Sequence, residues 1–164
     1  MIRQAVPSDE PAIRAIARAS YTRYVAAMGR EPAPMVADFG AQIAAGQVWV
    51  TEGGFIVFFE RDGAMFLENV AVHPDAAGQG IGKALIGHCE AVARKAGLPA
   101  VTLYTNAKMT ANLSLYPHLG YAQVDRRMED GFDRVYFRKC LAPDGCPGEG
   151  QVSGSSSAWI AVTG

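Results

Sequence analysis

The stretch NVAVHPDAAGQGIGKAL, residues 69–85, decides how this chain folds. It begins with an alternating apolar run, which is typical of a strand with one buried face. A His-Pro-Asp sequence at residues 73–75 then ends the strand, because proline cannot donate to a strand ladder. Glycines follow at Gly78, Gly80 and Gly82, and a helix-forming segment comes next. The order predicts a strand, a glycine-rich turn and a helix.

A glycine-rich turn of this kind is suited to binding a phosphate group. It directs several backbone N–H groups toward one point, and the start of the helix adds partial positive charge there. Glycine also lets a phosphate approach the backbone closely, because it has no side chain. A flexible surface turn remains the alternative, and Lys83 is either an added cation or a solvated helix residue. The candidate cradle consists of Gly78, Gln79, Gly80, Ile81, Gly82 and Lys83.

Two other phosphate-binding motifs fit this turn poorly. A Walker A loop requires G-x-x-x-x-G-K-[ST], but Ala84 follows Gly82-Lys83, and Ala77 stands where the first glycine belongs. A Rossmann turn requires G-x-G-x-x-G inside a parallel β-α-β unit. This chain has G-x-G-x-G after a strand that is predicted to belong to an antiparallel meander. Both motifs are therefore disfavoured.

Hydrophobic periodicity places strands and helices on both sides of this turn. Tight turns at Glu52-Gly53-Gly54 and Asp62-Gly63 separate three strands, which predicts the antiparallel meander over residues 47–72. The pattern predicts one α/β domain over residues 1–141, with a mixed, mostly antiparallel sheet of six or seven strands flanked by helices. Residues 142–164 are rich in Gly, Ser and Pro and are interpreted as a C-terminal tail. Strands are expected at 2–5, 47–51, 55–60, 65–72, 100–105, 121–127 and 134–141, and helices at 9–28, 35–45, 81–96 and 110–119.

The whole-chain composition excludes several classes of function. The net charge of −1 gives no basic excess that would indicate a nucleic-acid partner. No apolar stretch has the length of a signal peptide core or of a membrane span, so no membrane partner is expected. The three cysteines, Cys89, Cys140 and Cys146, have no paired spacing, which disfavours a disulfide framework or a metal site. A cytoplasmic location is the resulting expectation.

Two motifs, at residues 77–82 and 115–121, occur in the order and spacing of a known family. The first aligns with the acyl-CoA signature [Q/R]-x-x-G-x-[G/A], in which both glycines match and Ala77 replaces the leading Gln or Arg. The second, Leu-Tyr-Pro-His-Leu-Gly-Tyr, matches L-Y-x-x-x-G-[FY] in full. The chain thus resembles the GNAT superfamily of acetyl-CoA-dependent N-acetyltransferases over residues 1–141.

The resemblance implies a GNAT-like domain with acetyl-CoA as co-substrate. The glycine turn would bind the CoA pyrophosphate, and the pantetheine arm would lie along the strand backbone at Val70 and Val72. Asn112 is an offset match to a family asparagine that bonds the CoA arm, because the commoner spacing falls on Met109. The alanine at Ala77 should weaken cofactor affinity while leaving the N–H cradle intact.

Acetyl transfer to an amine needs a base, a proton donor and an oxyanion donor. The resemblance implies that Tyr116 is the general acid near the sulfur and that the Val70 N–H faces the oxyanion. Glu68 is the only carboxylate in the strand at 65–72, and strict alternation puts it on the same face as Val70 and Val72. Burial there would raise its pKa, which suits a base acting directly or through a water. Each role has an alternative. Tyr116 would only pack on the core, and Glu68 would only make a structural hydrogen bond.

The predicted function is direct transfer of the acetyl group of acetyl-CoA to a primary amine of a small molecule or of a protein or peptide. A covalent acetyl-enzyme is not implied, because no cysteine has a histidine near it in the sequence. The alternative is a non-catalytic CoA-binding or interaction module on the same fold, which Ala77 favours and Tyr116 opposes. The sequence identifies no amine acceptor, and the apolar end of the tail leaves a homodimer open.

Overall fold

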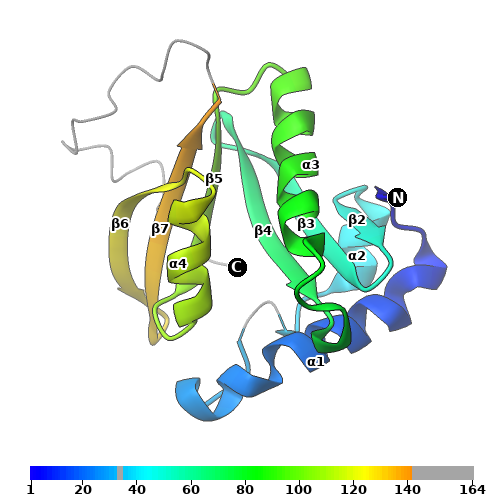
Figure 1. Ribbon diagram of the computed structural model, residues 1–164, viewed down its shortest axis with the longest axis horizontal. Helices are drawn as coiled ribbons and strands as arrows, with labels where there is room; N and C mark the ends of the chain where they lie inside the picture. The colour runs from blue at the N-terminus through cyan, green and yellow to red at the C-terminus, as the bar shows by residue number, and fades with distance from the viewer. Residues whose placement is uncertain (33–34, 142–164) are drawn as a thin grey trace.

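The computed structural model describes residues 1–32 and 35–141, which form one seven-stranded sheet with helices on both faces (Figure 1). The strand order is β1-β2-β3-β4-β5-β7-β6. The strands are β1 Arg3–Gln4, β2 Val48–Thr51, β3 Gly54–Arg61, β4 Ala64–Val72, β5 Ala100–Asn106, β6 Ala122–Glu129 and β7 Phe132–Cys140. The α-helices are α1 Glu10–Met28, α2 Phe39–Ala44, α3 Ile81–Lys95 and α4 Thr110–His118, and short 3-10 turns occur at Pro7–Asp9 and Pro74–Ala76.

The elements expected from the sequence are all present, and the α/β class is confirmed. Strands β2, β3 and β4 form the antiparallel meander, and the pairing of β4 with β5 is the parallel one. Helix α2 is shorter than expected because its start is set by Asp38, whose carboxylate accepts a hydrogen bond from the Ala41 N–H at 3.0 Å. The tail predicted at residues 142–164 lies outside the described residues.

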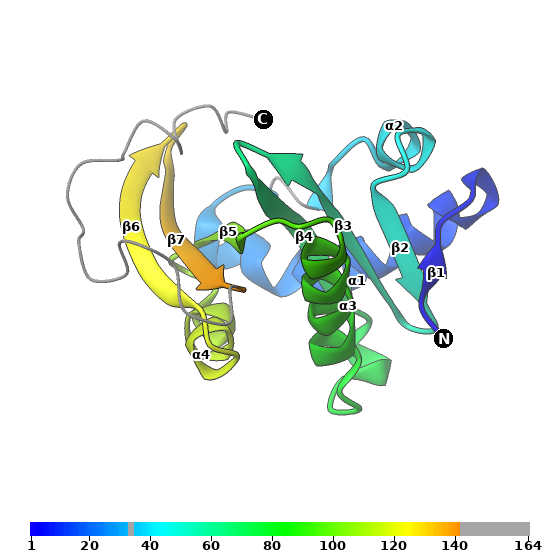
Figure 2. The same ribbon diagram turned by 90° about the horizontal axis from the view of Figure 1, so that it is seen from above.

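Two apolar cores lie on opposite faces of the sheet. Figure 2 shows α3 and α4 on one side of the sheet and α2 on the other. The first core joins α3 and α4 to the sheet, with Leu85, Cys89 and Tyr116 among its buried members. The second joins α1 and α2 to β2 and β3 through residues such as Ile13 and Phe39. Strands β3 and β4 therefore contribute apolar side chains to both cores.

The sheet is incomplete between its two central strands. Strand β5 pairs with β7 along its whole length, but it pairs with β4 only at Met65 and Phe66. From Leu67 onward the two strands diverge, as Figure 1 shows. This part of β4 has β3 on one edge and no strand on the other. The divergence opens the sheet beside residues 68–72, which include candidate residues of the sequence analysis.

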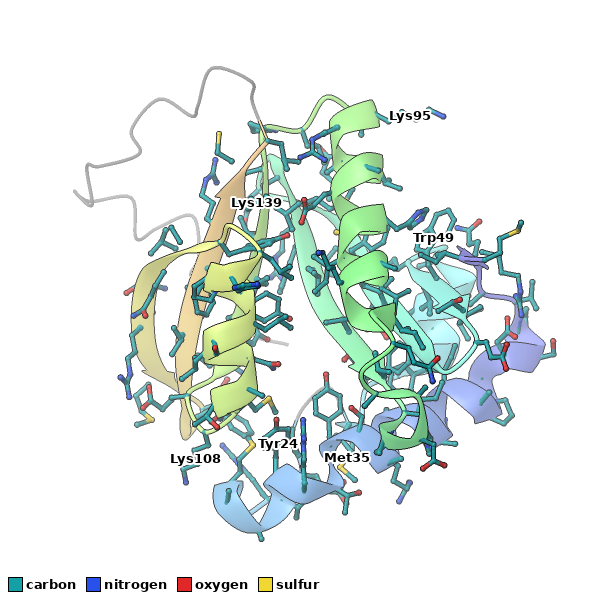
Figure 3. The ribbon with its side chains drawn as sticks, viewed as in Figure 1. Tyr24, Met35, Trp49, Lys95, Lys108 and Lys139 are labelled. Carbon is teal, nitrogen blue, oxygen red and sulfur yellow. The ribbon has the colours of Figure 1, made fainter. Side chains whose placement is uncertain are left out.

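A buried carboxylate ties α3 to the strand layer. Glu90 is 7% exposed, and its Oε1 accepts a hydrogen bond from Lys139 Nζ on β7 at 2.8 Å. The Tyr121 hydroxyl donates to the other carboxylate oxygen at 3.1 Å. Figure 3 shows Lys139 between β7 and α3. The three side chains hold the helix against the far half of the sheet.

This ion pair predicts a loss of stability when the lysine is removed. Lys139→Met should lower the free energy of unfolding by about 1.5–3 kcal/mol, because the buried Glu90 carboxylate loses a charged hydrogen-bond donor. Urea denaturation measures the change. Lys95→Met, at an exposed site near the end of α3, is the control and should change stability by less than about 0.5 kcal/mol. Equal losses in the two variants would contradict this role of the pair.

The cysteines of the described chain differ in state. Cys89 is a free thiol buried on α3 in the first core. Cys140 at the end of β7 is disulfide-bonded, so the expectation that the cysteines stay unpaired is wrong for this residue. In the same residues, no three His, Cys, Asp or Glu side chains are grouped as metal ligands.

Candidate active site

The glycine turn has the geometry of an anion cradle. Gly78 and Gly80 have positive φ values of 82° and 78°, which only glycine adopts without strain, and Gly80 is the N-cap of α3. Among the described residues, the N–H groups of residues 78–83 have no hydrogen-bond partner; the first that does is Ala84, which donates to the Gly80 carbonyl at 3.0 Å. A Cβ on Gly78 or Gly80 would meet no atom within 4 Å, so the space over the turn is open.

The side chains of the cradle contribute unequally. Gln79 and Lys83 are exposed to solvent, whereas Ile81 packs against the core beneath α3. A Cβ on Gly82 would lie 3.6 Å from Val72 Cγ2, which is an ordinary contact. The expected anion site therefore depends on backbone N–H groups, and Lys83 is a solvent-exposed cation in the first turn of α3.

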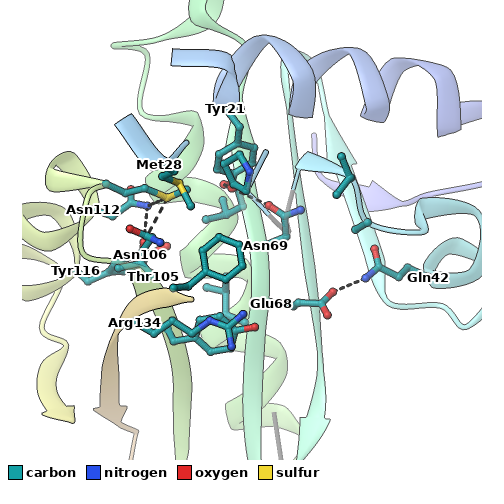
Figure 4. A pocket seen from close by; sticks show the side chains of 18 of the residues that line it. Tyr21, Met28, Gln42, Glu68, Asn69, Thr105, Asn106, Asn112, Tyr116 and Arg134 are labelled. Carbon is teal, nitrogen blue, oxygen red and sulfur yellow. Dashed lines mark hydrogen bonds between the residues drawn. The ribbon is translucent and has the colours of Figure 1, made fainter. Parts of the chain in front are cut away.

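The diverging strands β4 and β5 enclose a cavity of about 370 Å³ (Figure 4). Its walls come from both strands and from α1, α2, α4 and β7. Of the site residues predicted from the sequence, Glu68, Val70, Asn112 and Tyr116 line it. The structure thus brings the predicted acid, the predicted base and the free edge of β4 to one cavity. Val72 and the cradle residues lie outside it, toward the end of β4 and the start of α3.

Glu68 is turned into the cavity by a β-bulge. Val57 pairs with Asn69 and Phe58 pairs with Leu67, so Glu68 is the extra residue on β4. The expectation that Glu68 shares a face with Val70 and Val72 is therefore wrong. Val70 packs with the α3 core, whereas Glu68 reaches the α2 side and accepts a hydrogen bond from the Gln42 amide. The bulge shifts the alternation by one residue, which the sequence pattern alone did not show.

Burial gives Glu68 the character of a base. Desolvation raises the pKa of the Glu68 carboxyl above its usual range, although the hydrogen bond from Gln42 and the charge of Arg61 oppose the shift. A carboxylate with a raised pKa takes up a proton more readily than an exposed one. Its position in the cavity wall allows contact with a bound amine.

Tyr116 lies on α4, where it belongs to the first core and lines the cavity. It is 4% exposed and packs edge-on to Tyr121, with ring centroids 5.7 Å apart. Burial raises the pKa of Tyr116 above its usual range, and the nearby Cys89 thiol adds to this shift. The phenol therefore stays protonated and is available as a proton donor.

The edge of β4 that faces the cavity is open to an extended ligand. Val70 and Val72 have β3 on one side, in register with Ile56 and Gly54, and no strand on the other. Asn112 lies across the cavity on α4, where its amide donates to Thr105 Oγ1 at 3.0 Å. An arm that pairs with the β4 backbone would pass between these elements, as the resemblance implied.

Several polar residues of the cavity were not predicted from the sequence, and Tyr21, Asn69 and Arg134 are among them. The Tyr21 hydroxyl lies within hydrogen-bond distance of Asn69 Oδ1 at 2.8 Å and of the Val70 carbonyl at 3.0 Å. Asn69 is buried, and so is Arg134 on β7. The adjacent polar residues Glu68 and Asn69 within an apolar strand were a readable signal of the bulge. No comparable signal marked Tyr21 or Arg134, because both fit ordinary helix and strand patterns.

The family of the chain follows from comparison of its sequence with known domains. The family described as "Acetyltransferase (GNAT) domain" matches this chain over residues 42–123, which include the meander, the glycine turn, α3, β5 and α4. The chain therefore belongs to the GNAT family of acetyltransferases. No curated protein sequence matches it.

Solved structures with the same fold include several acetyltransferases. PaiA N-acetyltransferase from Thermoplasma acidophilum, in complex with coenzyme A, has a TM-score of 0.69 and 18% identity over 85% of this chain and 98% of its own. YncA, a putative acetyltransferase from Salmonella typhimurium with acetyl-CoA, has a TM-score of 0.66 and 20% identity over 90% and 96%. The ribosomal-protein-S18-alanine N-acetyltransferase from Escherichia coli has a TM-score of 0.63 and 21% identity over 91% of this chain and 96% of its own. At these identities the similarity concerns the fold.

No helix within residues 1–32 and 35–141 is both long enough and apolar enough to cross a membrane.

Proposed function

We propose that this protein transfers the acetyl group of acetyl-CoA directly to a primary amine. The observation that supports this most strongly is the cavity between β4 and β5, which is lined by Glu68, Tyr116 and the open β4 edge. The open N–H groups of residues 78–83 fit the CoA pyrophosphate without a side-chain ligand. The free edge of β4 at Val70 and Val72 fits the pantetheine arm.

In the proposed reaction the ammonium nitrogen loses two protons and the departing thiolate gains one. Glu68, directly or through a water, takes a proton from the ammonium form of the acceptor, and the neutral amine attacks the thioester carbonyl. A new C–N bond forms, and the oxyanion is stabilised by the Val70 N–H. The C–S bond then breaks, and the thiolate of CoA takes the proton of the Tyr116 hydroxyl. The nitrogen gives its second proton to the Tyr116 phenolate, directly or through a water, which leaves the neutral amide. Glu68 then releases its proton to solvent.

A direct transfer agrees with the state of the described cysteines. The Cys89 thiol is fully buried, and burial raises its pKa above its usual range, so it is a poor nucleophile. Cys140 is disulfide-bonded and carries no thiol. Neither residue lines the cavity.

The test of this proposal is release of free CoA thiol when acetyl-CoA is mixed with a panel of amines. We expect thiol release that depends on both the protein and the amine, with one acetyl group found on the amine for each thiol released. Binding of acetyl-CoA, measured as a rise in Tm, without release of thiol with any amine would favour the non-catalytic module instead.

The proposed base makes a prediction about pH. Glu68→Gln should lower kcat/KM by about tenfold or more near pH ~6, where a lysine-like amine with a pKa of about 10.4 is almost entirely protonated. The deficit should shrink as the pH rises toward ~9, because the fraction of neutral amine then increases without a base. Profiles of kcat/KM against pH for the two proteins measure this difference.

Glu60→Gln is the matched control, because Glu60 is an exposed carboxylate on the neighbouring strand β3. It should leave the profile unchanged. A Glu68→Gln profile that runs parallel to that of the wild type at all pH values would exclude the proposed base and leave Glu68 with a structural role.

A further inference from the structure

Arg134 is a buried cation in the wall of the proposed active site. It lies on β7 and is 4% exposed. Its guanidinium carbon is 4.6 Å from the centroid of the Tyr104 ring and 5.4 Å from that of Phe132. Figure 4 shows the side chain extending from β7 toward the cavity that it lines. The two rings hold the guanidinium in one position through cation–π contacts.

Among the described residues, this guanidinium forms no ion pair with a carboxylate. Its Nη1 is buried without a hydrogen-bond partner, and Arg134 is the only lysine or arginine among the described residues that line the cavity. An arginine cannot lose its charge in a protein, so its burial without a counter-ion has a free-energy cost. The planar donor fork of arginine is suited to a carboxylate, which it binds with two parallel hydrogen bonds. A bound carboxylate would satisfy the orphan donor.

A second buried polar atom without a hydrogen-bond partner lies in the same cavity, and it is an acceptor instead of a donor. Gln42 donates through its amide nitrogen to Glu68, which leaves Gln42 Oε1 buried without a partner. An oxygen acceptor beside a carboxylate is suited to a positively charged N–H donor. Asp38, the other acid of the cavity wall, is already engaged by the Ala41 N–H at the start of α2. An ammonium group would therefore bind at Gln42 and Glu68.

We infer that the acetyl acceptor is a free amino acid with an apolar side chain. Its amine would bind at Glu68 and Gln42, and its carboxylate would bind at Arg134. The inference rests on the proposed function and names its substrate class. Met28, Val36 and Phe132 also line the cavity, so an apolar side chain that branches from the α-carbon would meet apolar lining. A polyamine would bring a second cation to Arg134 and would bind poorly.

The inference is tested with leucine, methionine and phenylalanine, each offered as the free acid and as the carboxamide. The wild type should acetylate the acids with a kcat/KM about 10- to 100-fold above that of the amides, because a charged hydrogen-bonded pair is lost in the amide. Arg134→Met should abolish this preference, and Arg134→Lys should restore part of it. Arg138→Met, on the same strand outside the cavity, is the control and should keep the full preference.

Binding provides a readout that does not require turnover. In the presence of CoA, the free acids should raise the Tm of the wild type more than the carboxamides do, and this difference should vanish in Arg134→Met. Acetylation of acids and amides at equal rates would overturn the inference and leave the proposed function intact. Arg134-dependent binding of the acids without turnover of any amine would overturn the proposed function and, with it, the acceptor role, and would leave only a carboxylate-binding site at Arg134. If the acids neither bind nor react in preference to the amides, the inference is wrong.

Discussion

Replacing Tyr116 by phenylalanine should lower kcat by about 100-fold or more while the affinity for acetyl-CoA changes little. The variant keeps the ring that packs against Tyr121 and Phe137, so the core around α4 is preserved. It lacks only the hydroxyl, whose proton is proposed to pass to the departing thiolate, and general acids contribute about 10²–10⁴ to the rate. Steady-state kinetics with a saturating amine, together with acetyl-CoA titration, separate kcat from binding.

Tyr104→Phe is the matched control for this substitution. Tyr104 also lines the cavity but lies on β5, and no step of the proposed reaction uses its hydroxyl. We expect a much smaller change in kcat from it than from Tyr116→Phe. A Tyr116→Phe variant with the kcat of the wild type would refute the proton-donor role and leave Tyr116 as a packing residue.

Replacing Gly80 by valine should abolish acetyl-CoA binding. The backbone at Gly80 has a φ of 78°, a conformation that β-branched residues rarely adopt, so the turn must distort to accept the new side chain. The open space around Gly80 is also the space over the N–H groups, where a valine side chain would meet the phosphates. Isothermal titration with acetyl-CoA should show at least a 100-fold weaker affinity, which corresponds to about 2.7 kcal/mol.

The control for this substitution is available on the same helix. Gly87 on α3 has no positive φ, and a Cβ there would also meet nothing within 4 Å. Gly87→Val therefore adds the same side chain to the same helix away from the turn and should leave acetyl-CoA affinity unchanged. Equal affinities in Gly80→Val and the wild type would exclude the glycine turn as the pyrophosphate site.

The sequence predicted the fold well because its signals were local. The positive φ at Gly78 and Gly80, and the start of α3 after them, follow from one glycine-rich segment between an alternating strand and an amphipathic stretch. The Leu-Tyr motif at residues 115–121 likewise fell on α4 and the turn after it. Each of these features depends on neighbours within a few residues, so periodicity and turn chemistry were sufficient.

The candidate site was predicted only in part because its remaining features depend on contacts between distant segments. The face to which Glu68 turns is set by a bulge that forms only when β4 pairs with β3. Arg134 and the solvent-exposed Arg126 both belong to the last hairpin, and only the folded chain shows which is buried. Tyr21 continues the apolar stripe of α1 from Ile13, and its contact with Asn69 crosses 48 positions in the chain.

The short pairing of β4 with β5 has a consequence for the lifetime of the protein in a cell. The two halves of the sheet meet through just two residue pairs, so a pantetheine arm bound along β4 would act as a missing strand between them. A ligand that binds only the folded state stabilises it by RT ln(1 + [L]/Kd), about 2.7 kcal/mol at a hundredfold excess over Kd. The metabolic supply of acetyl-CoA would then set how often the chain opens to proteases, and starvation would shorten its half-life.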